Sequence, residues 1–258
     1  MPIHHSHGIT FVTSETLESH EVKHGFFMRH GGCSPQPWKS LNMATSVGDS
    51  RENVIENRNR IADALQINKT SFYNLWQVHS DRVVIADNPR LLSNAHIQAD
   101  ALVTSKNQVA LLMLFADCVP ILFYEPEHNV IASAHAGWKG TLSGVASETI
   151  KVMVEKFYCS PGNIIGVIGP SICRNHYQVG NDVVDKAMNV FRTEDNVINS
   201  HNEKIFMDLP TANRLIMEKC GMKTIERLDI CTMCNNEDWF SHRGEKGKTG
   251  RFAAVITL

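Results

Sequence analysis

The chain has 258 residues, of which 43% are hydrophobic and 20% are charged, and its formal net charge is −2 at pH 7. A chain of this length buries about 70–75% of its unfolded surface, so a self-sufficient core is expected. The near-neutral charge excludes a global field that would recruit nucleic acid or an anionic membrane. The longest apolar run, residues 109–115, is too short to span a bilayer, and the N-terminus lacks the pattern of a secretory signal. We therefore expect a cytoplasmic protein with no nucleic-acid or membrane partner.

The seven cysteines are an odd number and are spread over the whole chain. Small secreted domains use a compact set of cysteines as a disulfide framework, and no such set is present here. Reduced thiols are therefore expected.

The first residues combine a histidine-containing terminus with short strands. Residues 1–8 contain His4, His5 and His7, which could bind metal adventitiously but have no partner ligand nearby, and such a terminus is typically mobile. Two apolar runs, 9–12 and 25–28, predict strands. The glycine-rich turn 29–35 follows, and it is either a tight connection or an anion cradle with Arg29 beside it.

A polar segment with apolar residues at helical spacing comes next. Asp49 is a plausible N-cap, and the spacing predicts a surface helix that ends near Leu65. Arg58 and Arg60 of this helix are expected to be solvated.

His79 lies between two predicted strands, 72–78 and 82–86. Two further strands are predicted at 99–104 and 109–115. Asp100 interrupts the apolar sequence there, and because burying an unpaired carboxylate is costly, it must be hydrogen-bonded or functional.

A hairpin is predicted from strands 121–124 and 130–134 with the turn 125–129 between them. The ends of a short hairpin lie close together, so this one should bring Cys118 near His135. With His79 as a third donor, the set would be a three-ligand site with an open position, which is the arrangement of a catalytic zinc. A cysteine nucleophile with a histidine base is the competing interpretation.

The second half of the chain predicts helices at 142–157, 183–191 and 209–221 and strands at 163–168 and 252–256. The start of the first helix, beside Lys139, is a possible anion site. The polar stretch 192–204 is expected to be a mobile insert. Cys231 and Cys234 form a Cys-x-x-Cys pair, but no second such pair is present, so a structural zinc site is poorly supported.

Several motifs together resemble one known family over nearly the whole chain. The most specific are Ala-Asp-Cys-Val-Pro at 116–120 and His-Ala-Gly-Trp-Lys-Gly at 135–140; others are Arg-His-Gly-Gly-Cys-Ser at 29–34, Gln-Val-His at 77–79, Ser-His-Arg at 241–243 and Thr-Gly-Arg at 249–251. The chain resembles the laccase-domain, or multicopper polyphenol oxidase, family, whose members are described as purine nucleoside phosphorylases with adenosine deaminase activity. The resemblance implies an α/β (α+β) fold: one domain, residues 1–258, with mixed β-sheets flanked by helices, similar to the catalytic domain of cytotoxic necrotizing factor.

The resemblance also implies a transferase that uses Zn²⁺, held by His79, Cys118 and His135, and inorganic phosphate as co-substrate. Copper fits less well, because multicopper oxidases use repeated His-x-His pairs and only residues 5–7 have that spacing. The expected substrates are adenosine, inosine, guanosine and methylthioadenosine, and the expected state is a monomer or weak homodimer.

Roles for other residues follow from this resemblance. Arg29 is the first candidate for binding phosphate and Lys139 the second. Asn42 and Arg251 are expected to contact substrate, and Asp117 is expected to shuttle protons or orient a ligand.

Two other functions are compatible with the same residues. Some family members resemble an editing hydrolase that removes L-Ser from a nucleotide-linked muramic acid precursor. A non-catalytic interaction protein with a structural zinc ion is a third possibility, which three ligands in a loop-rich setting disfavour.

Overall fold

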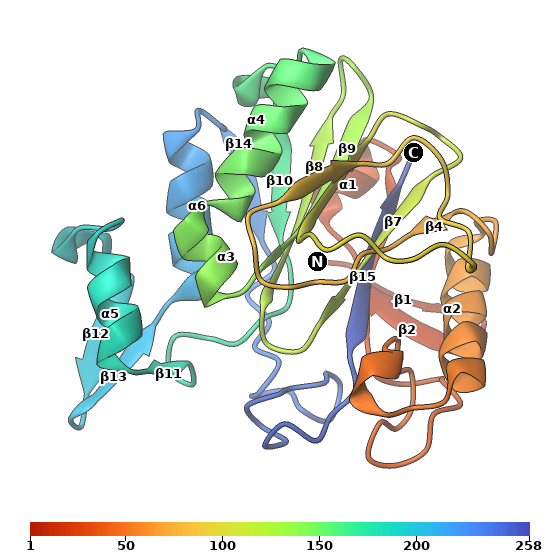
Figure 1. The fold of residues 1–258 in the computed structure, drawn as a ribbon, viewed down its shortest axis with the longest axis horizontal. Helices are drawn as coiled ribbons and strands as arrows, with labels where there is room; N and C mark the ends of the chain where they lie inside the picture. Colours follow the sequence, from red (N-terminus) through yellow and green to blue (C-terminus); the bar gives the residue numbers. More distant parts are fainter.

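The computed structural model describes residues 1–258 as two six-stranded sheets packed face to face between helices (Figure 1). The first sheet has the order β1 (Ile3–Ser6), β2 (Ile9–Val12), β3 (Lys23–Phe27), β15 (Phe252–Thr257), β7 (Ala110–Phe115), β4 (Phe72–Tyr73). The second has the order β14 (Thr224–Arg227), β10 (Ile165–Ile168), β8 (Val119–Glu125), β9 (Val130–Ala136), β6 (Ala101–Thr104), β5 (Val83–Ile85). Both sheets are mixed, since most neighbours are antiparallel but β4–β7, β5–β6 and β10–β14 are parallel.

Helices cover the two outer faces. Helix α2 (Arg51–Leu65) lies on the first sheet, and α3 (Trp138–Ser143), α4 (Val145–Phe157) and α6 (Leu209–Lys219) lie on the second (Figure 1). A small sheet of β11 (Gln178–Val179), β13 (Lys204–Met207) and β12 (Ile198–His201) stands at one end with α5 (Asn181–Met188). Helix α1 (Glu15–Ser19) and the 3₁₀ turns η1 (Thr45–Val47), η2 (Pro161–Asn163) and η3 (Thr193–Asp195) complete the fold.

The alternation of side chains along the strands explains the layers. In β7, Leu111 and Met113 belong to the core between the two sheets, whereas Ala110 and Leu112 belong to the core under α2. Successive strand residues point to opposite faces, and both faces of this sheet are covered, so β7 is apolar throughout. No helix of the fold is both long and apolar enough to cross a membrane.

The expected mixed α/β single-domain architecture is therefore confirmed, and so is the β8–β9 hairpin. His135 lies within β9, opposite Pro120, rather than just beyond the strand as expected. The helix expected at 142–157 is two helices, because Gly144, at φ 89°, ends α3 and begins α4.

Two segments expected to be mobile form regular structure. Residues 3–6 pair with β2. His4 Nε2 donates to Glu18 Oε1, lies 2.9 Å from Thr13 Oγ1, and its ring stacks on Phe11. The stretch 192–204 contributes β12 and the turn into β13.

The start and the inner face of α2 also differ from expectation. Ser50, not Asp49, is the N-cap, since its hydroxyl accepts a hydrogen bond from the Asn53 amide. Arg58 is not solvated: its guanidinium donates to the Met43 carbonyl at 3.0 Å, and burial lowers the pKa of Arg58 to about 10.

Candidate metal centre

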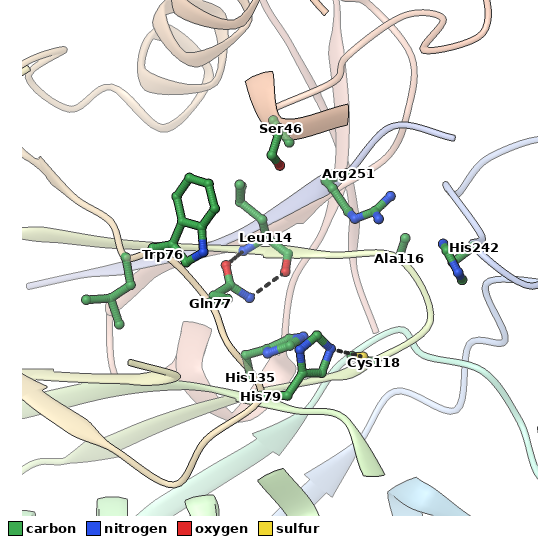
Figure 2. A pocket seen from close by; sticks show the side chains of 12 residues that line it. Ser46, Trp76, Gln77, His79, Leu114, Ala116, Cys118, His135, His242 and Arg251 are labelled. Atoms are coloured by element: carbon green, nitrogen blue, oxygen red, sulfur yellow. Dashed lines mark hydrogen bonds between the residues drawn. The ribbon is translucent and has the colours of Figure 1, made fainter. Parts of the chain in front are cut away.

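Three side chains from different loops and strands meet at one end of the second sheet. His79 lies in the loop between β4 and β5, three residues after Trp76, which pairs with Gln98. Cys118 lies in the turn between β7 and β8, and His135 projects from β9 (Figure 2). Their three donor atoms all lie within 4.8 Å of one another, and Cys118 Sγ is 3.9 Å from His79 Nε2. The structure therefore brings together the three ligands that the sequence predicts.

A single carboxylate positions both histidines. Asp100 Oδ1 accepts a hydrogen bond from His135 Nδ1 at 2.8 Å, which leaves Nε2 of that ring to face the centre. Asp100 Oδ2 accepts from the backbone amides of Val78 at 3.1 Å and Ser80 at 2.7 Å. These amides flank His79, whose φ of 62° lies in the left-handed region. Asp100 is therefore both hydrogen-bonded and part of the site.

The charges at the centre favour a thiolate. Burial alone would raise the pKa of Cys118, but the charge of His135 and the hydrogen bonds of His135 and His79 lower it to about 6. Burial would lower the pKa of His135, but Cys118 and Asp100 raise it to about 9. The thiolate is the form of cysteine that binds metals. A pKa of about 9 leaves His135 protonated on Nε2 at neutral pH while no metal is bound, so a metal ion would have to displace this proton before the ring could act as a ligand.

The space at the centre also fits a metal ion. Zn–S distances near 2.3 Å and Zn–N distances near 2.0–2.1 Å place tetrahedral donors about 3.3–3.8 Å apart, close to the spacing seen here. Gly137 borders the donors, and a Cβ there would lie 2.9 Å from both Cys118 Sγ and His79 Cδ2. The glycine therefore keeps open the room that the two ligands need.

The centre forms the shared floor of two cavities. The Trp76 lobe, of about 370 Å³, is lined by Ser46, Trp76, Gln77, Leu114, His135 and Arg251 among others. The Trp138 lobe, of about 310 Å³, is lined by Asp117, Trp138, Lys139, Tyr177, Leu209 and Arg243 among others. His79, Ala116, Cys118 and His242 line both lobes. Both volumes lie at the low end of the range of about 300–1,000 Å³ for small-molecule pockets.

Two further predicted residues, Lys139 and Arg251, line these lobes. Lys139 is exposed at the start of α3, with its ammonium 5.6 Å from the centre of the Trp138 ring. Arg251 Nη1 donates to the carbonyls of Thr249 and Gly250, and no other hydrogen bond engages the rest of its guanidinium. Both cations are placed to meet an anionic group in the cavity.

Asp117 lines the Trp138 lobe and accepts three hydrogen bonds. Its Oδ1 accepts from the hydroxyls of Thr232 and Ser241, each at 2.7 Å, and its Oδ2 accepts from the Arg243 amide at 2.6 Å. These donors fix the direction of the carboxylate, which suits the orienting role, and they leave about one of its four acceptor sites free.

Arg29 and Asn42 do not reach either lobe, in contrast to our expectation. The Arg29 guanidinium pairs with Glu245 at 3.1 Å and lies 4.4 Å from the centre of the Phe240 ring. The Asn42 side chain is completely buried, and its carbonyl accepts from the Arg251 amide at 2.9 Å. Arg29 therefore anchors the C-terminal loop, and Asn42 is a buried residue that positions the Arg251 backbone.

Sequence reasoning gave no role to Trp76, Gln77, Tyr177 and His242, which also line the lobes. Gln77 and His242 lie in the motifs at 77–79 and 241–243 that carry the family resemblance, and Trp76 directly precedes the first of these motifs. Gln77 holds the wall of the Trp76 lobe, because its amide group exchanges hydrogen bonds of 2.8 and 2.9 Å with the Leu114 backbone.

Residues 23–258 match the family model described as multi-copper polyphenol oxidoreductase laccase. The chain belongs to this family. Relatives include "Purine nucleoside phosphorylase" of Deinococcus radiodurans, 38% identical over 92% of this chain and 89% of that protein, and "Purine nucleoside phosphorylase YlmD" of Bacillus subtilis, 34% identical over the same shares. The crystal structure of the "hypothetical protein YfiH" of Bacillus licheniformis is similar over 100% of this chain and 99% of its own, with a TM-score of 0.91 and 32% identity.

Proposed function

We propose that this chain is a zinc-dependent purine nucleoside phosphorylase that accepts adenosine, inosine, guanosine and methylthioadenosine and also deaminates adenosine. The observation that carries the proposal is the open three-donor centre of His79, Cys118 and His135 on the floor of two cation-lined lobes. The names of the relatives support the same reaction class.

The three donors would hold the metal and leave one position facing the cavity. Bound Zn²⁺ supplies a Lewis acid there, close to oxygen or nitrogen atoms of the substrate. Asp100 keeps His135 in the tautomer whose Nε2 can act as a ligand, since Nδ1 donates to the carboxylate.

The Trp76 lobe suits a purine. The Trp76 side chain is 54% exposed although it is large and apolar, and it forms one wall of the lobe (Figure 2). Stacking of a base on an aromatic ring contributes about 1–3 kcal/mol. We assign Trp76 to the purine face and Ser46, across the lobe, to polar contact with the nucleoside.

Phosphate would be held by the guanidinium of Arg251, which replaces Arg29 as our first candidate. Burial lowers the pKa of Arg251, whereas Cys118 and Asp117 raise it, so a bound anion would compensate a partly desolvated cation. Lys139 remains the second candidate, on the Trp138 side of the centre.

In phosphorolysis a phosphate oxygen forms a bond to C1′ of the ribose while the bond from C1′ to the purine nitrogen breaks. The leaving base takes the bonding electron pair and requires a proton. We assign delivery of this proton to His242, which lines both lobes and whose imidazole makes no hydrogen bond within the chain.

Incubation of metal-quantified protein with adenosine, with and without inorganic phosphate, tests the proposal. Adenine that forms only with phosphate supports phosphorolysis, and inosine that forms without phosphate supports deamination. If zinc-loaded protein forms neither adenine nor inosine, the proposal is contradicted.

A second candidate is the hydrolase that removes L-Ser from a nucleotide-linked muramic acid precursor. It is favoured by the alignment of a thiol of lowered pKa, Cys118, with His135 and Asp100, which is the arrangement of an activated nucleophile. Release of serine by metal-stripped protein, lost in Cys118→Ser, would favour this candidate, since the phosphorylase requires the metal.

A further inference from the structure

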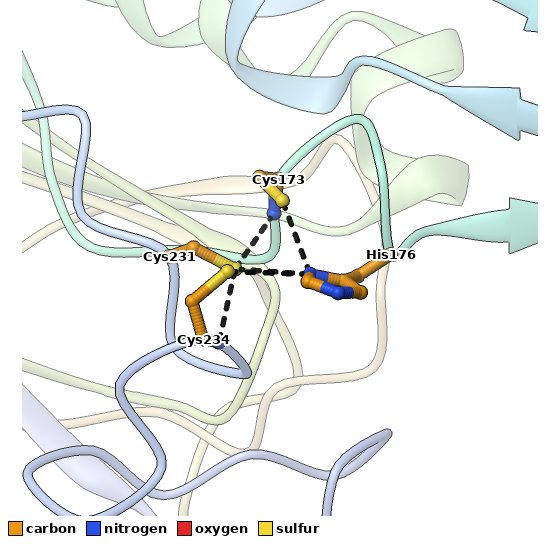
Figure 3. Close-up of side chains that lie close together, drawn as sticks. All are labelled: Cys173, His176, Cys231 and Cys234. Atoms are coloured by element: carbon orange, nitrogen blue, oxygen red, sulfur yellow. Dashed lines mark hydrogen bonds between the residues drawn. The ribbon is translucent and has the colours of Figure 1, made fainter.

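Four side chains outside the pocket centre converge between two loops (Figure 3). Cys173 and His176 lie in the loop between β10 and β11, and Cys231 and Cys234 lie in the loop that follows β14. The four donor atoms lie within 4.8 Å of one another. His176 Nδ1 is 3.3 Å from Cys173 Sγ, 3.4 Å from Cys234 Sγ and 3.8 Å from Cys231 Sγ. These separations match the spacing of about 3.3–3.8 Å that zinc bond lengths impose on tetrahedral donors.

The backbone fixes the two loops against each other independently of these side chains. Ser171 and Cys231 form a parallel bridge, in which the Ser171 amide donates to Ile230 at 3.0 Å and the Thr232 amide donates to Ser171 at 3.1 Å. The two Cys/His pairs, each with two residues between its members, are therefore held face to face. Pre-positioned donors of this kind lose little conformational freedom when a metal binds.

Backbone amides surround the most buried sulfur. Cys231 is 7% exposed, and its Sγ accepts hydrogen bonds from the amides of Cys173 at 3.3 Å and Cys234 at 3.4 Å. Hydrogen bonds to a ligand atom orient it and stabilise the thiolate form that a metal requires. A disulfide would use only two of the three sulfurs and would give no role to the imidazole placed among them.

We propose that Cys173, His176, Cys231 and Cys234 form a second, structural zinc site that is independent of the centre in the pocket. Three thiolates and one imidazole are a closed tetrahedral set, with no position left for a substrate. Soft thiolate donors in this geometry select zinc over the oxygen-preferring Mg²⁺ and Ca²⁺. The sequence poorly supports a structural zinc site because no second Cys-x-x-Cys pair is present, but the fold places Cys173 and His176 beside Cys231 and Cys234 as possible donors.

The site would brace the walls of the Trp138 lobe. Tyr177, next to His176, lines that lobe, and the Arg243 guanidinium donates to the carbonyls of His176 and Gln178. Thr232, between the two cysteines, donates its hydroxyl to Asp117. A metal that joins the two loops would therefore hold Tyr177, Arg243 and Asp117 in place.

Metal content of the full chain tests the proposal. Protein produced with added Zn²⁺ and then dialysed should carry two zinc ions per chain by elemental analysis. Cys118→Ala and Cys234→Ser should each carry one, and the double variant should carry none. The control Cys33→Ser, which changes an exposed thiol outside both clusters, should keep two.

The outcomes separate this proposal from the proposed function. A different result would be a single zinc ion in the wild-type protein, which is absent from Cys234→Ser and present in Cys118→Ala. This result would support the second site and count against the metal centre in the pocket. Wild-type zinc content in Cys234→Ser would overturn the second site.

Cobalt spectroscopy gives an independent measurement if Cys234→Ser does not fold. In Cys118→Ala/Cys159→Ser, stripped of metal and reloaded with Co²⁺, neither the pocket centre nor the group of Glu125, His128 and Cys159 offers a thiolate, so thiolate–cobalt charge-transfer bands report the second site. We expect near-ultraviolet charge-transfer bands together with the visible bands of tetrahedral Co²⁺. Absence of these bands, or a mass lower by two hydrogens under non-reducing conditions that indicates a disulfide, would overturn the proposal.

Discussion

His135 donates its Nδ1–H to Asp100 over 2.8 Å, and this pair lies beneath the centre with side chains that are 5% and 0% exposed. The hydrogen bond from His135, together with those from Ser80, outweighs burial and lowers the pKa of Asp100 to about 2. Asp100 is therefore a carboxylate at neutral pH, and it fixes which nitrogen of His135 faces Cys118 and His79.

Replacement of this carboxylate by an amide should weaken metal binding without unfolding the protein. Asp100→Asn has nearly the same shape but removes the charge that stabilises the ring, so we expect zinc affinity to fall about 10–100-fold. Competition with a chromophoric chelator measures the affinity. The control Asp185→Asn, at an exposed position of α5, should leave it unchanged; equal affinities for the two variants would contradict the role of Asp100.

Gly137 should not tolerate a methyl group. Its φ of −74° suits any residue, so the obstacle in Gly137→Ala is the Cβ placed 2.9 Å from Cys118 Sγ and His79 Cδ2. Crowding of about 1–3 kcal/mol corresponds to a loss of roughly 5–150-fold in zinc affinity. Gly162→Ala is the matched control, because the nearest atom there is 3.4 Å away in the flexible Lys223 side chain. Similar affinities for both variants would show that the two ligands can move apart.

Replacement of Trp76 should weaken substrate binding without changing the stability of the fold. Because the side chain is 54% exposed, Trp76→Ala should change the free energy of unfolding by less than about 0.5 kcal/mol. Loss of stacking should raise KM for inosine about 5–150-fold, and Trp76→Phe should recover most of the affinity. Tyr158→Ala, at an 80% exposed aromatic residue away from the lobes, is the control. An unchanged KM in Trp76→Ala would show that the purine does not stack on Trp76 in this lobe.

His24 should make the stability of the fold sensitive to acid. Its Nε2 accepts from the Ser14 amide and its Nδ1 donates to the Val22 carbonyl, each at 2.8 Å, so the neutral ring fits and a protonated ring does not. Burial, the largest effect, lowers the pKa of His24 below 6.5. In the unfolded chain the ring therefore takes up its proton at higher pH than in the fold, and stability that is complete above about pH 6.5 is lost as the pH falls below that value.

Urea unfolding at about pH 7.5 and 5.5 measures this effect. The loss of stability between the two values should be smaller in His24→Gln than in the wild type and unchanged in the control His201→Gln, at an exposed position of β12. The same loss in all three proteins would show that His24 does not contribute to it.

The convergence of Cys118 and His135 could be predicted because it is local. The short turn between β8 and β9 determines that Cys118 and His135 meet. Arg29 could not be assigned from its own segment, because Glu245 and Phe240, more than 200 positions away, occupy its guanidinium. The sequence of the glycine-rich turn 29–35 does not indicate these long-range contacts.

The cluster of Cys173, His176, Cys231 and Cys234 could not be predicted from the sequence for a different reason. Each pair, Cys173 with His176 and Cys231 with Cys234, has zinc-ligand spacing, but the two pairs are 55 positions or more apart. Only the bridge between Ser171 and Cys231, which is part of the tertiary fold, sets them face to face. A search for mixed Cys/His pairs, rather than for two Cys-x-x-Cys pairs, would have found all four ligands.

Zinc titration of the metal-stripped protein tests the central claim most directly, with phosphate-dependent release of hypoxanthine from inosine as the readout. We predict that the stripped protein is inactive, that its activity rises as Zn²⁺ binds, and that Cys118→Ala stays inactive at every zinc concentration. Full phosphate-dependent turnover by the stripped protein, or by Cys118→Ala, would contradict a catalytic metal held by His79, Cys118 and His135.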